Sequence, residues 1–155
     1  MTDTERLADL ELTIEELIEE NKRFPVIVEG DKDVAGLRAL GLEGDILKVN
    51  VGMSLVNFAG DLARRFSRVI ILTDWDRTGG TIARRLTTYL ESESVEWDLG
   101  YRRRFARTAR GEIRTVEALP ALLANVRRRA DERLDPAVWG SNADVEASAP
   151  GEEDT

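Results

Sequence analysis

The chain contains no cysteine and no histidine. Their absence excludes disulfides, zinc sites built from these residues, cysteine nucleophiles and histidine acid–base catalysis from this sequence. Any catalysis must therefore depend on carboxylates, hydroxyls, lysine or arginine. Any bound metal is expected to be a hard cation that prefers oxygen ligands, such as Mg²⁺ or Mn²⁺.

Long apolar runs are also lacking, and none approaches the ~20 residues that a membrane-spanning helix needs. The N-terminus is charged from Asp3 onward, with no basic segment leading into an apolar one, so it does not resemble a secretion signal. We therefore expect a cytoplasmic protein that is not associated with membranes. Lysine is scarce too, since only Lys22, Lys32 and Lys48 occur among 22 basic residues. This scarcity and the acidic ends of the chain suggest a halophilic, high-salt cytoplasm.

Positive charge is in deficit overall, because the formal net charge is −8 at pH 7. Residues 3–20 carry eight acids and one arginine, and residues 140–155 carry five acids and no base. The segment 101–114 differs, with six arginines and one glutamate. Phosphate binding needs clustered Lys and Arg, so the balance argues against a general nucleic-acid coat and directs attention to this basic segment.

Short apolar runs rich in β-branched residues alternate with helical patterns along the chain. The strand candidates are 26–28, 45–49, 69–72 and 95–99, and the helix candidates are 4–21, 33–40, 54–66, 78–91 and 116–134. Strands that are apolar throughout and separated by helices are typical of βαβ units and a parallel sheet covered on both faces. The expected fold class is therefore α/β. Residues 101–110 fit either a helix or an irregular segment.

Three parts of the chain differ in composition. We expect an acidic N-terminal helix over residues 1–24, an α/β domain over residues 25–134, and an acidic tail over residues 135–155. The tail is small and polar in composition, which is typical of a flexible terminus.

Acidic residues follow two of the predicted strands. The first strand is followed by Glu29 and, in the next turn, Asp33; the third is followed by Asp74 and Asp76. Open parallel sheets bind ligands at the carboxyl ends of their strands, so these acids are expected at one edge. Residues two apart on extended chain project to the same face, which lets Asp74 and Asp76 converge. Two nearby carboxylates repel unless a proton or a cation intervenes.

Helix capping is the alternative explanation for each acid taken alone. Asp76 or Thr78 is placed to cap a helix that begins near residue 79, and Asp33 is placed in a first turn where acids are common. A cap accounts for one acid but not for two acids together with Glu29. Both the metal site and the cap therefore stay open from the pattern alone.

These residues have a family resemblance. The segments VEGDKD (28–33) and DWDRTGG (74–80) resemble the Toprim domain, which is shared by type IA and type II topoisomerases, primases, a ribosomal RNA maturase and recombination proteins. The likeness covers Pro25 to Leu123. Three segments, 26–50, 69–86 and 113–123 (IRTVEALPALL), are similar to the small stand-alone Toprim proteins found in archaea. The resemblance implies a Rossmann-like Toprim fold with a mostly parallel sheet of about four strands flanked by helices.

The resemblance also implies roles for the acids. Glu29 corresponds to a general acid/base or metal ligand, Asp74 and Asp76 to the divalent-metal aspartates, and Asp33 to a further acidic metal position. These roles imply Mg²⁺, or Mn²⁺, and cleavage, transfer or joining of phosphodiester bonds in DNA or RNA. The basic segment is a candidate nucleic-acid-binding surface or a solvated face, and its residues are Arg102, Arg103, Arg104 and Arg107. Trp75 fits stacking on a base or packing against a helix.

Two other functions remain open. A Toprim core of this size fits a non-catalytic module that holds a metal, a protein partner or a second copy of itself within a nucleic-acid assembly. The motif Asp74-x-Asp76-x-Thr78 also fits the opening motif of haloacid-dehalogenase-type phosphatases, with Asp74 as nucleophile. That family places its motif after the first strand, whereas Asp74 follows the third predicted strand.

Overall fold

The computed structural model describes residues 1–49 and 51–134, so the predicted tail at 135–155 lies outside the described residues. Helices and strands alternate through most of it. Their order is α1 (Asp3–Asn21), β1 (Val26–Val28), α2 (Asp31–Leu40), β2 (Ile46–Lys48), α3 (Leu55–Arg65), β3 (Arg68–Ile71), α4 (Arg77–Ser92), β4 (Glu96–Asp98), α5 (Gly100–Ala109), the 3₁₀-helix η1 (Val116–Ala118) and α6 (Leu119–Leu134).

The four strands form one parallel sheet in the order β2-β1-β3-β4. This confirms the predicted α/β class and the strand count. The chain runs from β1 outward to β2, then returns to β3 on the other side of β1. The strand order therefore reverses between β1 and β3, and such a switch point is where open α/β sheets bind ligands.

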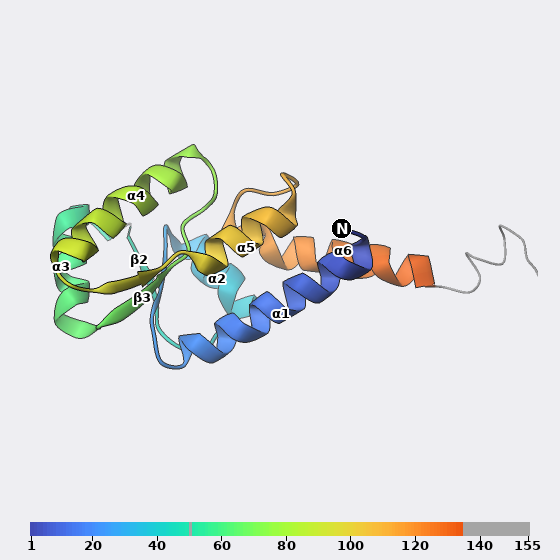
Figure 1. Ribbon diagram of the computed structural model, residues 1–155, viewed down its shortest axis with the longest axis horizontal. Helices are drawn as coiled ribbons and strands as arrows, with labels where there is room; N and C mark the ends of the chain where they lie inside the picture. The colour runs from blue at the N-terminus through green and yellow to red at the C-terminus, as the bar shows by residue number, and fades with distance from the viewer. Residues whose placement is uncertain (50, 135–155) are drawn as a thin grey trace, which may run out of the picture. The chain divides into compact units, whose positions relative to one another are not determined.

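Helices cover both faces of the sheet (Figure 1). On one face α3 and α4 pack against each other and over the sheet residues Ile27, Val69 and Ile71, which are fully buried. On the other face α5 packs on β3 and α2 packs on β2. Burial on both faces explains why β1 and β3 are apolar at every position rather than at alternate ones.

Local signals explain where the helices begin and end. Ser54 precedes α3, and its Oγ accepts a hydrogen bond from the backbone N–H of Asn57 at 3.1 Å, so the predicted start at 54 is the cap. Gly41 ends α2 with φ = 110°, a left-handed conformation that glycine adopts without strain. The segment 101–110, for which the pattern allowed either a helix or an irregular structure, forms α5 up to Ala109, and Arg110 is the C-cap.

The predicted helix at 116–134 has two parts. Its first three residues form η1, and α6 begins at Leu119, so Pro120 occupies the first turn, where its missing N–H costs nothing. None of the helices in the described part of the chain is long and apolar enough to cross a membrane.

The described residues fall into two compact units, one of residues 1–8 and 123–134 and one of Asp9–Leu122. Within the first unit, the carboxylate of Asp3 pairs with the buried Arg6 at 3.7 Å and with Arg133 at 3.6 Å. The second unit contains the whole sheet and all of the predicted site residues. The boundaries predicted from composition, at 24 and 134, stay a prediction.

Candidate metal site at the sheet switch point

Glu29 directly follows the end of β1, and its side chain reaches across to the end of β3. Its Oε2 accepts a hydrogen bond from the backbone N–H of Asp74 at 2.9 Å. The carboxyl ends of the two central strands are therefore joined by this side chain, at the point where the strand order reverses. Glu29 and Asp74 therefore lie together, as expected for acids that follow two neighbouring strands.

Asp74 is held by a segment from much further along the chain. Its Oδ1 accepts a hydrogen bond from the backbone N–H of Val116 at 2.8 Å. The preceding residue, Thr73, is fully buried, and its hydroxyl donates to the carbonyl oxygen of Gly79 at 2.8 Å. The loop that carries Asp74 is thus fixed from two sides.

Asp76 caps α4, because its Oδ1 accepts a hydrogen bond from the backbone N–H of Gly79 at 2.7 Å. Of the two caps that the sequence left open, Asp76 or Thr78, the structure has Asp76. A Cβ on Gly79 would lie 1.8 Å from the carbonyl oxygen of Asp74 and 2.9 Å from Oε2 of Glu29. Only glycine therefore fits at position 79, which brings the start of α4 against the acids.

Asp33 lies in the first turn of α2 and is buried. Its Oδ2 accepts a hydrogen bond from the backbone N–H of Gly30 at 3.1 Å, and backbone groups of Glu29 and Glu117 also stabilise its charge. Asp33 thus combines the predicted first-turn position with closeness to the other acids. Its carboxylate is more fully engaged by backbone groups than those of Asp74 and Asp76.

Burial and mutual repulsion disfavour the charged forms of these carboxyl groups. The pKa of Asp74 is raised to about 6, mainly by burial and also by the negative charges of Asp33, Glu29 and Asp76, against the opposing hydrogen bond from Val116. Burial likewise raises the pKa of Glu29 and of Asp33, with smaller contributions from neighbouring acids. A cation placed among them would remove this penalty.

The four arginines predicted as a nucleic-acid surface lie in two environments. Arg102 is half-buried and donates from Nε to the carbonyl of Thr73 at 3.1 Å and from Nη2 to the carbonyl of Asp74 at 2.9 Å. Arg104 donates to the carboxylate of Glu16 at 2.5 Å. Arg103 and Arg107 are exposed.

Sequence reasoning missed several contacts that hold the site. The two carbonyl bonds from Arg102 and the backbone donor of Val116 left no signal in the pattern, since both depend on how distant segments fold together. The role of Trp75 was among those that the sequence allowed, because packing against a helix was one of its two predicted roles. Its ring stacks on Phe105 with centroids 6.4 Å apart, and its Nε1–H donates to the carbonyl of Ile113 at 2.8 Å.

The donor chemistry at this edge fits Mg²⁺. Glu29, Asp74 and Asp76 each use one carboxylate oxygen to accept from a backbone N–H. Within residues 1–49 and 51–134, no partner is recorded for the second oxygen of any of the three. Backbone bonds of this kind orient ligands, and one or two carboxylates with water suffice for Mg²⁺. No three acids of the described residues lie close enough together to form a complete ligand set.

The parallel sheet, the switch point and the acids that follow β1 and β3 define a class of protein. The Toprim domain model matches residues 24–108, and the chain belongs to the Toprim domain family. Toprim domains generally bind Mg²⁺, and membership of the family suggests a nucleic-acid-related, metal-binding function for this chain.

Particular relatives are small archaeal proteins named UPF0292. The one from Methanosarcina barkeri is 37% identical over 132 residues, which cover 82% of this chain and 92% of that protein. The one from Thermoplasma volcanium is 42% identical over 101 residues, 65% of this chain and 83% of that protein. The one from Thermococcus gammatolerans is 37% identical over 122 residues, 77% of this chain and 90% of that protein.

A solved structure of a protein from Aquifex aeolicus has the same fold. It superposes with a TM-score of 0.59 at 22% sequence identity, covering 68% of this chain and 93% of that chain. At this identity the likeness concerns the fold, and it agrees with the α/β architecture of the sheet.

Proposed function

We propose that the chain cleaves or transfers phosphodiester bonds in nucleic acid with the help of Mg²⁺, held by the carboxylates of Asp74 and Asp76 together with water, with Glu29 beside them as general acid/base. The observation that supports this is the arrangement of their carboxylates at the switch point. Each one is oriented by a backbone N–H through one oxygen, which leaves the second oxygen for the cation at Asp74 and Asp76 and for a proton at Glu29. Asp33 is proposed as an additional acidic group that strengthens the negative field of the site.

The chemistry of the proposal follows from the residues. Mg²⁺, when bound, supplies positive charge that stabilises the phosphate in the transition state. The hydrogen bond from the backbone N–H of Asp74 to the Glu29 carboxylate links the ends of β1 and β3, so the acids that follow these two strands keep a fixed position relative to each other. Arg102 fixes the loop at Thr73 and Asp74 from the carbonyl side and partly balances the acids. Glu29, whose pKa is raised by burial, is the candidate to carry a proton at Oε1.

Metal binding is tested by titrating the purified chain with Mg²⁺ in a calorimeter. We expect the variant Asp74→Asn/Asp76→Asn to lose Mg²⁺ binding while keeping its fold, because asparagine retains the oxygens that accept from Val116 and Gly79. Asp61→Asn is the matched control, since Asp61 lies on α3 and pairs with Arg64 and Arg65. An unchanged Mg²⁺ affinity in the double variant would overturn the ligand assignment.

Turnover is tested separately, with labelled single-stranded, duplex and structured DNA and RNA in Mg²⁺ or Mn²⁺. Cleavage that disappears with EDTA and in Asp74→Asn/Asp76→Asn supports the proposal. Mg²⁺ binding without cleavage of any of these substrates would instead support a non-catalytic module that works beside a protein partner or a second copy. The Toprim membership argues against the phosphatase alternative, as does the position of Asp74 after β3 rather than β1.

A further inference from the structure

The arginines of α5 are divided between the inside of the fold and its surface. Arg102 and Arg104 are engaged, the first with the carbonyls of Thr73 and Asp74 and the second with Glu16. Arg103 and Arg107 are exposed, and the described part of the chain offers neither of their side chains a recorded hydrogen bond or ion pair. These two guanidinium groups are therefore available to an external anion.

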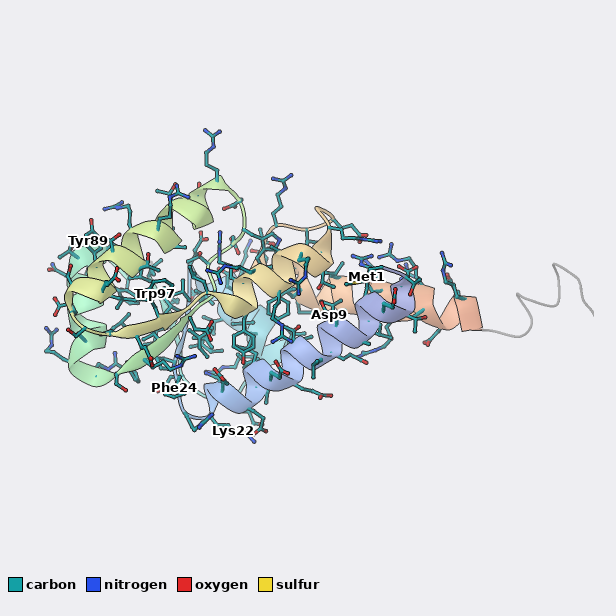
Figure 2. All side chains as sticks on the ribbon, in the orientation of Figure 1. Met1, Asp9, Lys22, Phe24, Tyr89 and Trp97 are labelled. Carbon is teal, nitrogen blue, oxygen red and sulfur yellow. The ribbon has the colours of Figure 1, made fainter. Side chains whose placement is uncertain are left out.

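Several arginines on other elements have internal partners. Arg68 pairs with Asp98 at 3.0 Å and with Glu96 at 3.4 Å, and it lies over the ring of Phe24, which Figure 2 labels. Arg64 and Arg65 on α3 both pair with Asp61. The chain has 30 acidic and 22 basic residues, so acidic residues outnumber the arginines that could pair with them. The side chains of Arg103 and Arg107, like that of Arg77 on α4, have no such partner among the described residues, so their charges are open to an external anion.

Arg103 and Arg107 also share one face of α5. Residues four apart on a helix are neighbours, separated by about 6 Å along the axis. The opposite face carries Tyr101 and Phe105, both buried. The outer face of α5 therefore presents two positive groups one helical turn apart.

Both ends of α5 are attached to the loop that carries the acids. At its start, Arg102 binds the carbonyls of Thr73 and Asp74. Beyond its end, the carbonyl of Ile113 accepts from Nε1 of Trp75 at 2.8 Å, and the carbonyl of Arg114 accepts from the backbone N–H of Trp75 at 3.0 Å. Helix α5 is consequently held in a fixed position next to the loop that carries Asp74.

We propose that Arg103 and Arg107 bind backbone phosphates of the nucleic-acid strand whose phosphodiester bond reacts at Glu29, Asp74 and Asp76. The inference rests on the proposed function and adds the surface that holds its substrate. Guanidinium groups bind phosphate through paired N–H donors, and such contacts position a strand without reading its sequence. Binding is therefore independent of sequence and weakens as salt rises.

Fluorescence anisotropy with labelled DNA and RNA, single-stranded and duplex, tests the surface. The measurements are made in EDTA so that no strand is cut, and across a series of salt concentrations. We expect Arg103→Gln/Arg107→Gln to weaken binding at least tenfold and to make the slope of log affinity against log salt shallower by about 1.5, because each lost phosphate contact contributes about 0.7–0.9. The comparison of DNA with RNA identifies which polymer the surface prefers.

Two further variants serve as controls. Arg64→Gln/Arg65→Gln changes the net charge equally but on α3, and it should leave the salt slope unchanged. Arg103→Lys/Arg107→Lys keeps both charges and should restore most of the binding. A salt slope that is the same in Arg103→Gln/Arg107→Gln as in the unaltered chain would overturn the proposal.

The surface and the proposed function fail in different ways. If Asp74→Asn/Asp76→Asn binds nucleic acid like the unaltered chain but does not cleave it, both proposals are supported. If the unaltered chain cleaves nucleic acid and Arg103→Gln/Arg107→Gln cleaves it with the same KM, the surface is wrong while the function stands. If the unaltered chain binds no nucleic acid with or without Mg²⁺, both are overturned.

Discussion

Replacing Asp74 by asparagine should stabilise the metal-free protein at neutral pH. The substitution removes the charge but keeps the oxygen that accepts from the backbone N–H of Val116 at 2.8 Å. The pKa of Asp74 is raised from 3.8 to about 6, mainly by burial and in part by three neighbouring acids. In the absence of a metal, the ionised carboxylate is therefore a cost that the folded state bears and the unfolded chain does not.

The sign and size follow from linkage. Because the pKa is higher in the folded state, the unfolded chain binds fewer protons between about pH 4 and 6, so the unaltered protein loses stability as pH rises through this range. A shift of about two units corresponds to about 3 kcal/mol when Asp74 is fully ionised. Solvent screening at a partly exposed side chain reduces this, and we expect about 1–2 kcal/mol.

The assay is urea unfolding in EDTA at pH 7.5 and pH 4.5. At pH 7.5 we expect Asp74→Asn to unfold at higher urea than the unaltered protein, with an unchanged m-value. At pH 4.5 the advantage should fall by more than half, because Asp74 is then largely protonated in the folded state. Added Mg²⁺ should reverse the order, since a ligand that binds only the folded, unaltered protein stabilises it alone.

An Asp74→Asn variant that is no more stable than the unaltered protein at pH 7.5 would refute the cost assigned to the ionised carboxylate. A gain in unfolding free energy that is equal at pH 7.5 and pH 4.5 would refute it as well. Asp61→Asn separates this local effect from a general decrease of negative charge. Asp61 pairs with Arg64 and Arg65, so its loss should give no gain in stability at pH 7.5.

Three further changes have outcomes that the structure predicts. In urea unfolding, Gly79→Ala should lower the free energy of unfolding by about 3 kcal/mol, because the added Cβ would clash with the carbonyl oxygen of Asp74. Gly80→Ala is the control and should be neutral or stabilising, because its Cβ would contact only the guanidinium nitrogens of Arg84 and Arg102, at 3.5 and 3.6 Å. Arg102→Met should cost about 1–3 kcal/mol in the same assay, since it removes two charge-assisted hydrogen bonds, and an unchanged midpoint would show these bonds to be dispensable. Asn21→Ala should lower the thermal midpoint, because the buried Asn21 amide makes three hydrogen bonds to backbone groups, and a midpoint equal to that of the unaltered protein would contradict this.

The fold was largely predictable from the sequence because its strands are buried on both faces. Runs such as 26–28 and 69–72 are apolar throughout, and this pattern together with the intervening helices indicates a parallel sheet. Strand order is a different matter. The neighbours of β1 are β2 and β3, and no local pattern specifies that pairing, because it depends on which helices cover each face.

The site was predictable to the extent that it lies next to strands. Glu29 and Asp74 follow strands whose carboxyl ends meet, so their closeness could be expected from topology. The contacts of Asp74 with Val116, and of Trp75 with Ile113, come from the segment after α5, and nothing in its sequence pattern pairs that segment with the loop at 73–76. The ligand roles of the acids remain predictions that the proposed titrations test.

The contacts that hold the site also bear on how the protein is made. Glu29 and Asp74 are 45 positions apart in the chain, and Asp74 and Val116 are 42 apart. Contacts of such long separation form only after the intervening chain has folded, because their loops must close first. During synthesis, therefore, Asp74 lacks its backbone partner until Val116 has left the ribosome. A chain truncated before that residue could fold its strands and still be without a finished site.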